Sequence, residues 1–120
     1  MNNDDKDVRL ALWQVYAAYN EHAIMLKLGK TTRDYMMAND LSVKKLLQSV
    51  MRAVDSFEYF RVSQHNHNPH VQGKVFEFLA RVPRTSMYVK FTVADRVILN
   101  SYHPAAKAVD STWTRRKARR

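Results

Sequence analysis

Two neighbouring predicted strands contain side chains that could transfer protons and bind phosphate. Apolar and polar residues alternate strictly over residues 86–94, and Tyr88 and Lys90 are among the polar positions. The second predicted strand, residues 97–103, follows after two residues. Facing positions of an antiparallel hairpin have Cβ atoms about 5 Å apart. If the two intervening residues form a tight turn, Tyr88 faces His103 with Lys90 nearby, whereas a one-residue change in the turn reverses this assignment.

Two earlier segments add charged side chains to the same surface. In residues 74–82, Glu77 and Arg81 occupy positions opposite the apolar ones, and in residues 57–64 Arg61 does so. If helices cover the apolar side of the sheet, these polar side chains all lie on the free side. The predicted surface then contains Arg61, Glu77, Arg81, Tyr88, Lys90 and His103.

These residue types fit the cleavage of RNA without a metal ion. One group removes the proton of the 2′-hydroxyl, another protonates the leaving 5′-oxygen, and cations stabilise the charge that develops on the phosphate. Histidine exchanges protons near neutral pH, arginine grips phosphate through two hydrogen bonds, and tyrosine stacks on a base or donates to phosphate. The same pattern is also ordinary for the wet face of an antiparallel sheet, which needs no function.

A second group of titratable side chains consists of His65, His67 and His70. Three imidazoles this close could bind a metal ion, but their spacing is not a strong zinc pattern, and no Cys or nearby acidic residue completes a site. We therefore predict a polar loop here, with no metal and no cofactor.

The charge of the chain favours a polyanionic partner. The net charge is +9, and residues 107–120 contain six basic residues and one acid, a net +5. Neutralising phosphates releases counterions, so such a segment is attracted to nucleic acid. A solvated tail that aids solubility is the alternative. The residues predicted to bind RNA are Lys90, Arg81, Arg84, Arg115, Arg116 and Lys117.

The composition excludes several classes of protein. The chain of 120 residues has no Cys, which excludes disulfides and thiolate metal sites and suits a reducing compartment. Its first residues are polar and acidic, so we expect no signal peptide. No apolar run approaches the roughly 18 residues of a membrane span. We expect a cytoplasmic protein with no membrane partner.

Apolar spacing predicts three helices in the first half of the chain. A long helix covers residues 4–28, and Thr31 or Thr32 caps a short helix that runs to Ala38. The third helix begins after Ser42, a favourable N-cap residue, and carries one apolar stripe that a sheet could cover.

A change of period after the third helix predicts a sheet. The expected strands cover residues 57–64, 74–82, 86–94 and 97–103. Helices followed by strands indicate an α+β fold, with helices packed on one face of an antiparallel sheet of about four strands. We predict a single domain over residues 1–106 and a basic tail over residues 107–120.

Short segments between residues 31 and 103 are similar to those of a known protein family. They are Thr31-Thr32-Arg33, the helix from Ser42, Glu58-Tyr59-Phe60-Arg61, Met87-Tyr88-Val89-Lys90-Phe91-Thr92-Val93 and Ser101-Tyr102-His103. In this order they resemble the MqsR type of toxin in bacterial toxin–antitoxin modules. The resemblance implies a RelE-like fold, in the barnase, EndoU, colicin and RelE group of ribonucleases. It also implies a sequence-selective mRNA interferase that a cognate antitoxin inhibits.

Position by position, the resemblance carries some functional residues over and departs at others. Tyr88 keeps a functional tyrosine, whereas Arg61 and His103 each replace a functional lysine. The family's glutamine on the second strand has no counterpart, because Phe76 or Glu77 lies there.

The prediction is a metal-independent endoribonuclease toxin that cleaves single-stranded mRNA and leaves a 2′,3′-cyclic phosphate. We expect His103 to be the general acid, Glu77 the base, and Tyr88 the residue that orients the RNA. The expected phosphate ligands at the catalytic site are Arg61, Arg81 and Lys90. The alternatives are a non-catalytic nucleic-acid-binding regulator of phage or plasmid type, and an adaptor whose tail binds an acidic protein.

Overall fold

The computed structural model describes residues 3–64 and 73–117, which form three helices and six strands. The helices are α1 (Asn3–Asn20), α2 (Lys30–Ala38) and α3 (Val43–Asp55). The strands are β1 (Met25–Leu26), β2 (Phe57–Gln64), β3 (Lys74–Arg81), β4 (Ser86–Val93), β5 (Val97–Pro104) and β6 (Thr114–Arg115). None of these helices is both long and apolar enough to cross a membrane.

The strands form one sheet with the order β1-β5-β4-β3-β2-β6. The predicted α+β order, with helices ahead of the four long strands, is confirmed. The predicted antiparallel sheet of about four strands is wrong in two respects. β1 and β6 add a two-residue strand at either edge, and β1 pairs with β5 in parallel. Strands that short contain no alternation that a sequence could reveal.

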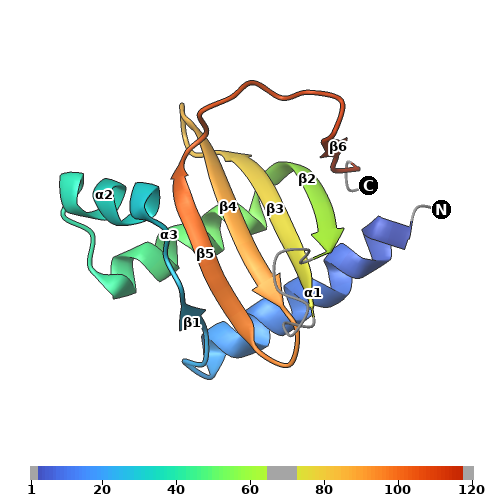
Figure 1. Ribbon diagram of the computed structural model, residues 1–120, viewed down its shortest axis with the longest axis horizontal. Coiled ribbons are helices and arrows are strands. Elements are labelled where there is room, and N and C mark those ends of the chain that lie inside the picture. Colours follow the sequence, from blue (N-terminus) through green and yellow to red (C-terminus); the bar gives the residue numbers. More distant parts are fainter. Residues whose placement is uncertain (1–2, 65–72, 118–120) are drawn as a thin grey trace.

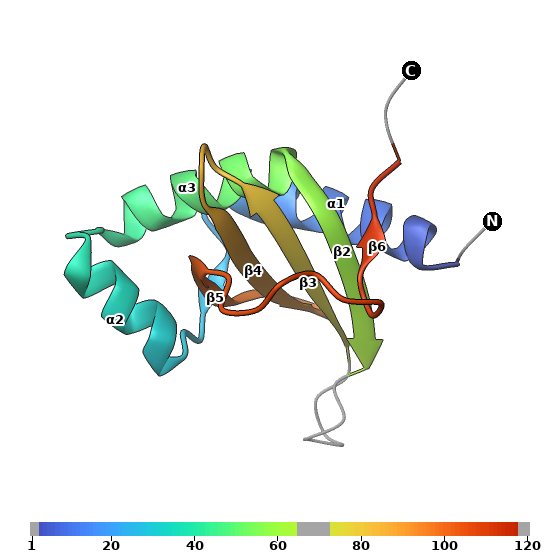
Figure 2. The ribbon, with the colours of Figure 1, turned by 90° about the horizontal axis from the view of Figure 1, so that it is seen from above.

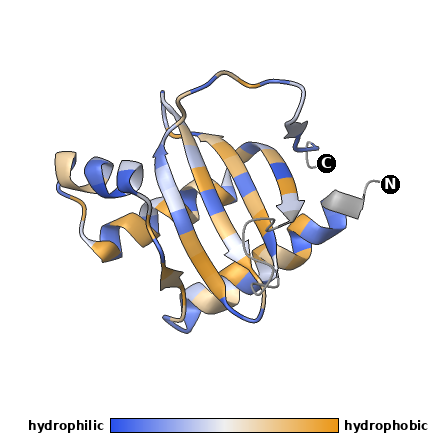
Figure 3. Ribbon diagram, viewed as in Figure 1, coloured by the Kyte–Doolittle hydropathy of each residue, from blue (hydrophilic) through white to orange (hydrophobic). Residues whose placement is uncertain are grey.

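The helices α1 and α3 cover one face of the sheet, and α2 lies beyond the β1–β5 edge (Figures 1 and 2). Apolar and polar residues alternate along the central strands (Figure 3). On the covered face, Val15 of α1 and Leu46 and Val50 of α3 belong to one buried core with Phe78 and Phe91. Full burial of such side chains contributes about 1.5–3 kcal/mol each, which fixes the covered face. We call the opposite face the open face.

The third helix follows the sequence prediction. The Ser42 hydroxyl accepts a hydrogen bond from the Lys45 N–H (3.2 Å), so Ser42 is the N-cap as expected. The predicted apolar stripe faces the sheet, with Leu46, Val50 and Val54 fully buried. Regular apolar spacing over a whole helix was therefore a sufficient signal here.

The predicted helix over residues 4–28 is wrong after Asn20. α1 ends at Asn20, and His22 adopts a positive φ of 56° that interrupts the helix. The chain then runs along β5, where the Lys27 N–H donates to the Leu99 carbonyl (3.0 Å). These hydrogen bonds go to a strand far along the chain, so helical spacing cannot anticipate them.

The second helix begins at Lys30, and neither Thr31 nor Thr32 caps it. Gly29 occupies the N-cap position, so no side chain caps this end of the helix. Thr32 is buried instead, and its hydroxyl accepts a hydrogen bond from the Tyr102 N–H (2.9 Å). The side chain expected to start α2 therefore ties α2 to β5.

Candidate active site on the open face

Five of the predicted site residues lie together on the open face. In the register across the sheet, Arg61 of β2 pairs with Glu77 of β3, and Glu77 pairs with Lys90 of β4. In the neighbouring row, Tyr88 of β4 pairs with His103 of β5. These pairings confirm the strand alternation read from the sequence and bring side chains from four strands to one place.

The pairing of Tyr88 with His103 is confirmed, although the two-residue turn that predicted it is wrong. Val93 pairs with Val97, so three residues separate β4 from β5. Within this loop the Ala94 N–H donates a hydrogen bond to the Arg96 carbonyl (3.1 Å), which stabilises the three-residue loop. A β-bulge then places Asn100 outside the residue-by-residue pairing with β4. The extra residue in the loop and the extra residue in the bulge cancel, and side-chain parity is restored.

Glu77 is the centre of a hydrogen-bonded cluster. Its Oε1 accepts from Nε of Arg61 (3.0 Å), and its Oε2 accepts from Nη2 (2.9 Å). Oε2 also accepts from the hydroxyl of Tyr88 (2.5 Å). The side chain of Glu77 is 12% exposed and that of Arg61 is 34% exposed. Charge-assisted bonds in this geometry hold side chains from three strands in fixed positions.

The cluster sets the protonation states of its members. Burial by itself would raise the pKa of Glu77, but hydrogen bonds from Arg61 and Tyr88, with the charges of Arg61 and Lys90, lower it. Burial, and then the hydrogen bond to Glu77, raise the pKa of Tyr88. Near neutral pH the pair is a carboxylate and a phenol. Because the strength of a base falls with its pKa, this geometry gives no support to Glu77 as the general base.

His103 lies half-buried near the end of β5, with its ring centroid 5.2 Å from that of Tyr88. Its Nδ1 is 2.8 Å from the carbonyl oxygen of Pro104. A carbonyl oxygen only accepts, so Nδ1 carries the proton and donates it. In the neutral ring Nε2 is then the atom that accepts a proton, and in the charged ring it can donate one. The contact with Pro104 therefore orients the ring for proton transfer through Nε2.

The segment after β5, residues 105–113, crosses the side of the sheet opposite the helices on its way to β6 (Figure 2), and we call it the strap. Its last residue, Trp113, lies over Arg61, with 4.2 Å between Cζ and the ring centroid. The same ring meets Tyr88 edge-on at 6.4 Å. Thr112 Oγ1 accepts from Nη1 of Arg61 (2.7 Å). Arg61 therefore binds Glu77 in the cluster and Thr112 in the strap, and it holds the strap against the cluster.

The sequence predicts only a basic tail where the strap and β6 lie. Asp110 accepts hydrogen bonds from the N–H (2.9 Å) and the hydroxyl (2.5 Å) of Thr112, which forms a turn. The chain then joins the sheet, with Arg115 opposite Tyr59 of β2. Trp113 is the open-face residue that sequence reasoning missed. The sequence signal that could have placed Trp113 after a turn is the Asp-Ser-Thr pattern before it, which is typical of such turns.

The cations expected to bind RNA do not share one surface. Arg81 and Arg84 are exposed at the end of the sheet where the strap begins. Arg115 is exposed in the edge strand β6. Arg116 instead packs on the ring of a core phenylalanine of β2 (4.3 Å), and Nζ of Lys117 lies 3.9 Å from an aspartate of α1. The last two cations therefore belong to the side of the sheet that the helices cover.

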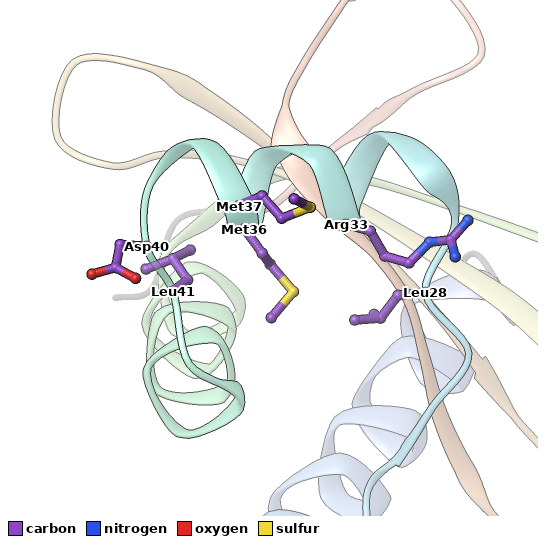
Figure 4. Close-up of a pocket in the computed structure, with 6 residues that line it drawn as sticks. All are labelled: Leu28, Arg33, Met36, Met37, Asp40 and Leu41. Atoms are coloured by element: carbon purple, nitrogen blue, oxygen red, sulfur yellow. The ribbon is translucent and has the colours of Figure 1, made fainter.

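A separate hollow of about 430 Å³ lies beside α2. Figure 4 shows Met36 between Leu41 and Leu28 in this hollow, with Met37 nearby. A lining of methionine and leucine suits adaptable apolar contacts. The hollow lies beyond the β1–β5 edge and contributes nothing to the cluster on the open face.

The described parts of the chain offer no metal centre. Within residues 3–64 and 73–117, no group of three or more His, Cys, Asp or Glu side chains is placed to hold a metal ion. The cluster of His65, His67 and His70 lies outside the described residues, so the prediction of a metal-free loop stays a prediction.

Replacement of Glu77 by glutamine should remove a pH-dependent part of the stability. A carboxylate whose pKa is lowered by folding stabilises the folded state above its unfolded pKa and loses this contribution as the pH falls. We therefore expect Glu77→Gln to lower the free energy of unfolding at neutral pH. The difference from the wild type should shrink below the usual Glu pKa of 4.5.

Urea unfolding as a function of pH tests this expectation. Glu58→Gln is the matched control, because Glu58 is exposed on the adjacent strand β2. A Glu77→Gln deficit that stayed constant down to about pH 3 would contradict an ionised Glu77 in the cluster.

Comparison of the chain with protein-family models, with curated proteins and with solved structures found no match. The similarity of its short segments to MqsR-type toxins therefore stays a prediction. The function has to be argued from the open face itself.

Proposed function

We propose that the open face binds single-stranded RNA and that the protein is a metal-independent endoribonuclease, acting as the toxin of a toxin–antitoxin pair. The observation that carries this proposal is the orientation of His103. Its Nδ1 is bound to the Pro104 carbonyl, and its Nε2 is left for proton transfer beside the ring of Tyr88. Cations and aromatic rings on the same face supply the means to hold RNA there.

Binding of RNA follows from the residues around this histidine. Trp113 and Tyr88 offer rings against which unpaired bases stack, a contact that tolerates any base sequence. Lys90, Arg81 and Arg84 supply positive charge for the phosphates. Single strands are favoured because their bases can turn out onto the rings. A cognate antitoxin would inhibit the protein by covering this face.

Cleavage requires one bond to form and one to break at phosphorus. The 2′-oxygen bonds to phosphorus, the bond from phosphorus to the 5′-oxygen breaks, and the 2′-hydroxyl proton passes to water. Protonated His103 gives the proton on Nε2 to the leaving 5′-oxygen. Lys90 stabilises the charge that develops on the phosphate. Arg61 and Glu77 hold Tyr88 and Trp113 in place.

Purified protein should cleave a labelled single-stranded RNA in the presence of EDTA. The reaction written above leaves a 2′,3′-cyclic phosphate and a 5′-hydroxyl, which mass spectrometry identifies. The same RNA annealed to its complement is the control, and it should be cut much more slowly. Loss of cleavage with EDTA and its return with zinc would replace this mechanism with a metal-dependent one.

A non-catalytic RNA-binding regulator is the second candidate, and the closed cluster favours it. Both oxygens of Glu77 and three nitrogens of Arg61 are already bound within the protein, which suits a rigid binding platform. Such a protein would bind the labelled RNA and leave it intact. Binding without cleavage, and without growth inhibition on induced expression, would decide for this candidate.

A further inference from the structure

The helix α1 presents apolar side chains away from the core as well as toward it. Val8, Ala11 and Val15 are buried against the sheet. On the outer side of the same helix, Trp13 is 80% exposed and Leu10 is 57% exposed. Leu10 and Trp13 are three residues apart on the helix, so their exposed side chains are neighbours, and contiguous apolar surface marks sites of interaction.

A groove runs beside Trp13 between α1, the strand β2 and the two residues that follow β6. Its volume is about 590 Å³. Phe57 and Phe60 of β2 and Leu12 of α1 contribute apolar lining, and Trp13 stands at its side. The groove therefore combines a mostly apolar interior with a large exposed aromatic ring. A few large side chains that become buried on binding, tryptophan prominent among them, supply most of the binding energy in protein interfaces.

The rim of the groove is positively charged. Arg9, Arg116 and Lys117 line it, against one acid, Asp5. Arg116 is held in place, because its Nη1 donates to the Asp55 carbonyl (3.1 Å). Arg9 is exposed on α1. Asp5 lies 3.9 Å from Lys117 and offsets one of these charges, so the rim keeps a net positive charge that is complementary to an acidic partner.

We propose that this groove is a docking site for an acidic amphipathic segment of a partner protein. Apolar side chains of that segment would fill the groove against Trp13, and its Asp or Glu residues would lie against Arg9, Arg116 and Lys117. The site lies on the helix-covered side of the sheet, so it does not depend on the function proposed for the open face.

The charge and the lining together favour this occupant over two others. A second copy of the chain would bring a net charge of +9 toward a cationic rim, which opposes self-association. RNA bases would find little ring surface to stack on inside the groove, because Phe57 is only 5% exposed and Phe60 only 3%. A segment with apolar side chains flanked by carboxylates would pack against the apolar lining and pair with the cations of the rim.

Fluorescence anisotropy with a labelled synthetic peptide tests the proposal on the full chain. The probe is an amphipathic peptide with leucines at helical spacing and glutamates on their flanks. The matched peptide has lysine in place of every glutamate. We expect the acidic peptide to bind and Trp13→Ala to weaken its binding about tenfold or more. Trp13 is largely exposed, so the variant should fold. Met37→Ala is the matched control, because Met37 is 82% exposed on α2.

A charge reversal separates the rim from the apolar lining. Arg9→Glu should weaken the acidic peptide and strengthen the lysine peptide, whereas Trp13→Ala should weaken both. Equal binding of the two peptides to the wild type would overturn the acidic partner. Displacement of the peptide by a single-stranded oligoribonucleotide would assign the groove to RNA. Concentration-dependent dimerisation in sedimentation velocity that Trp13→Ala abolishes would assign it to a second copy.

Discussion

Replacement of His103 by alanine should lower the rate of RNA cleavage by about 10²–10⁴, the usual contribution of a positioned acid or base. The reason is geometric, because the bond from Nδ1 to the Pro104 carbonyl fixes the tautomer and leaves Nε2 as the nitrogen for proton transfer. RNA affinity should change little, since the stacking rings and the cations on the open face remain. Single-turnover cleavage of a labelled RNA, with affinity and melting temperature measured alongside, gives all three quantities.

Ser101→Ala is the matched control for this experiment. Ser101 lies on the same strand and face as His103, in register with Lys90, but its hydroxyl does not titrate near neutral pH. It should cut RNA at nearly the wild-type rate. A folded His103→Ala variant that cut as fast as the wild type would remove this residue from the mechanism. It would also remove most of the argument for an enzyme.

Replacement of Trp113 by alanine should weaken binding of single-stranded RNA by about tenfold to a hundredfold, because stacking of one base on an aromatic ring contributes about 1–3 kcal/mol. The variant also loses the ring over Arg61 and the contact with Tyr88. A small fall in melting temperature should therefore accompany the loss of affinity. Titration of a labelled oligoribonucleotide measures the first effect and thermal unfolding the second.

The chain supplies its own control in its other tryptophan. Trp13 lies on α1, on the side of the sheet away from the open face, so Trp13→Ala should leave RNA affinity unchanged. An unchanged affinity in Trp113→Ala, together with a normal melting temperature, would show that the strap plays no part in RNA binding. Equal losses in both variants would indicate general attraction to aromatic surface.

Alternation allowed much of the open face to be predicted from the sequence. Burial alternates over residues 86–91 of β4, so Tyr88 and Lys90 could be assigned to one face, and Glu77 of β3 pairs with Lys90 on that face. In β3 the alternation is incomplete, because Val75 and Leu79 are buried as well. The position of His103 was right for an incomplete reason. A loop one residue longer than expected was offset by the bulge at Asn100, and neither leaves a clear pattern in a sequence.

Other features depended on contacts between distant segments and could not be predicted. The strand β1 exists because its backbone bonds to β5, and the residues of β6 bond to β2 in the same way. Strand parity brought Arg61 and Glu77 together, but it could not show that two hydrogen bonds would join them. Whether a carboxylate acts as a base or holds its neighbours in place depends on such bonds. The sequence alone could therefore not distinguish these two roles for Glu77.

The two shortest strands of the sheet have a consequence for aggregation. A meander of long strands exposes unpaired N–H and C=O groups on its first and last members, where another molecule could add a strand. β1 occupies that position along β5, and β6 occupies it along β2. Each is only two residues long, and β6 ends in the exposed Arg115, so neither offers a long apolar edge in turn. The segments that flank the meander in the sequence thus cover part of each edge, at Ile98 and Leu99 of β5 and at Tyr59 and Phe60 of β2, and reduce the backbone open to edge-to-edge association.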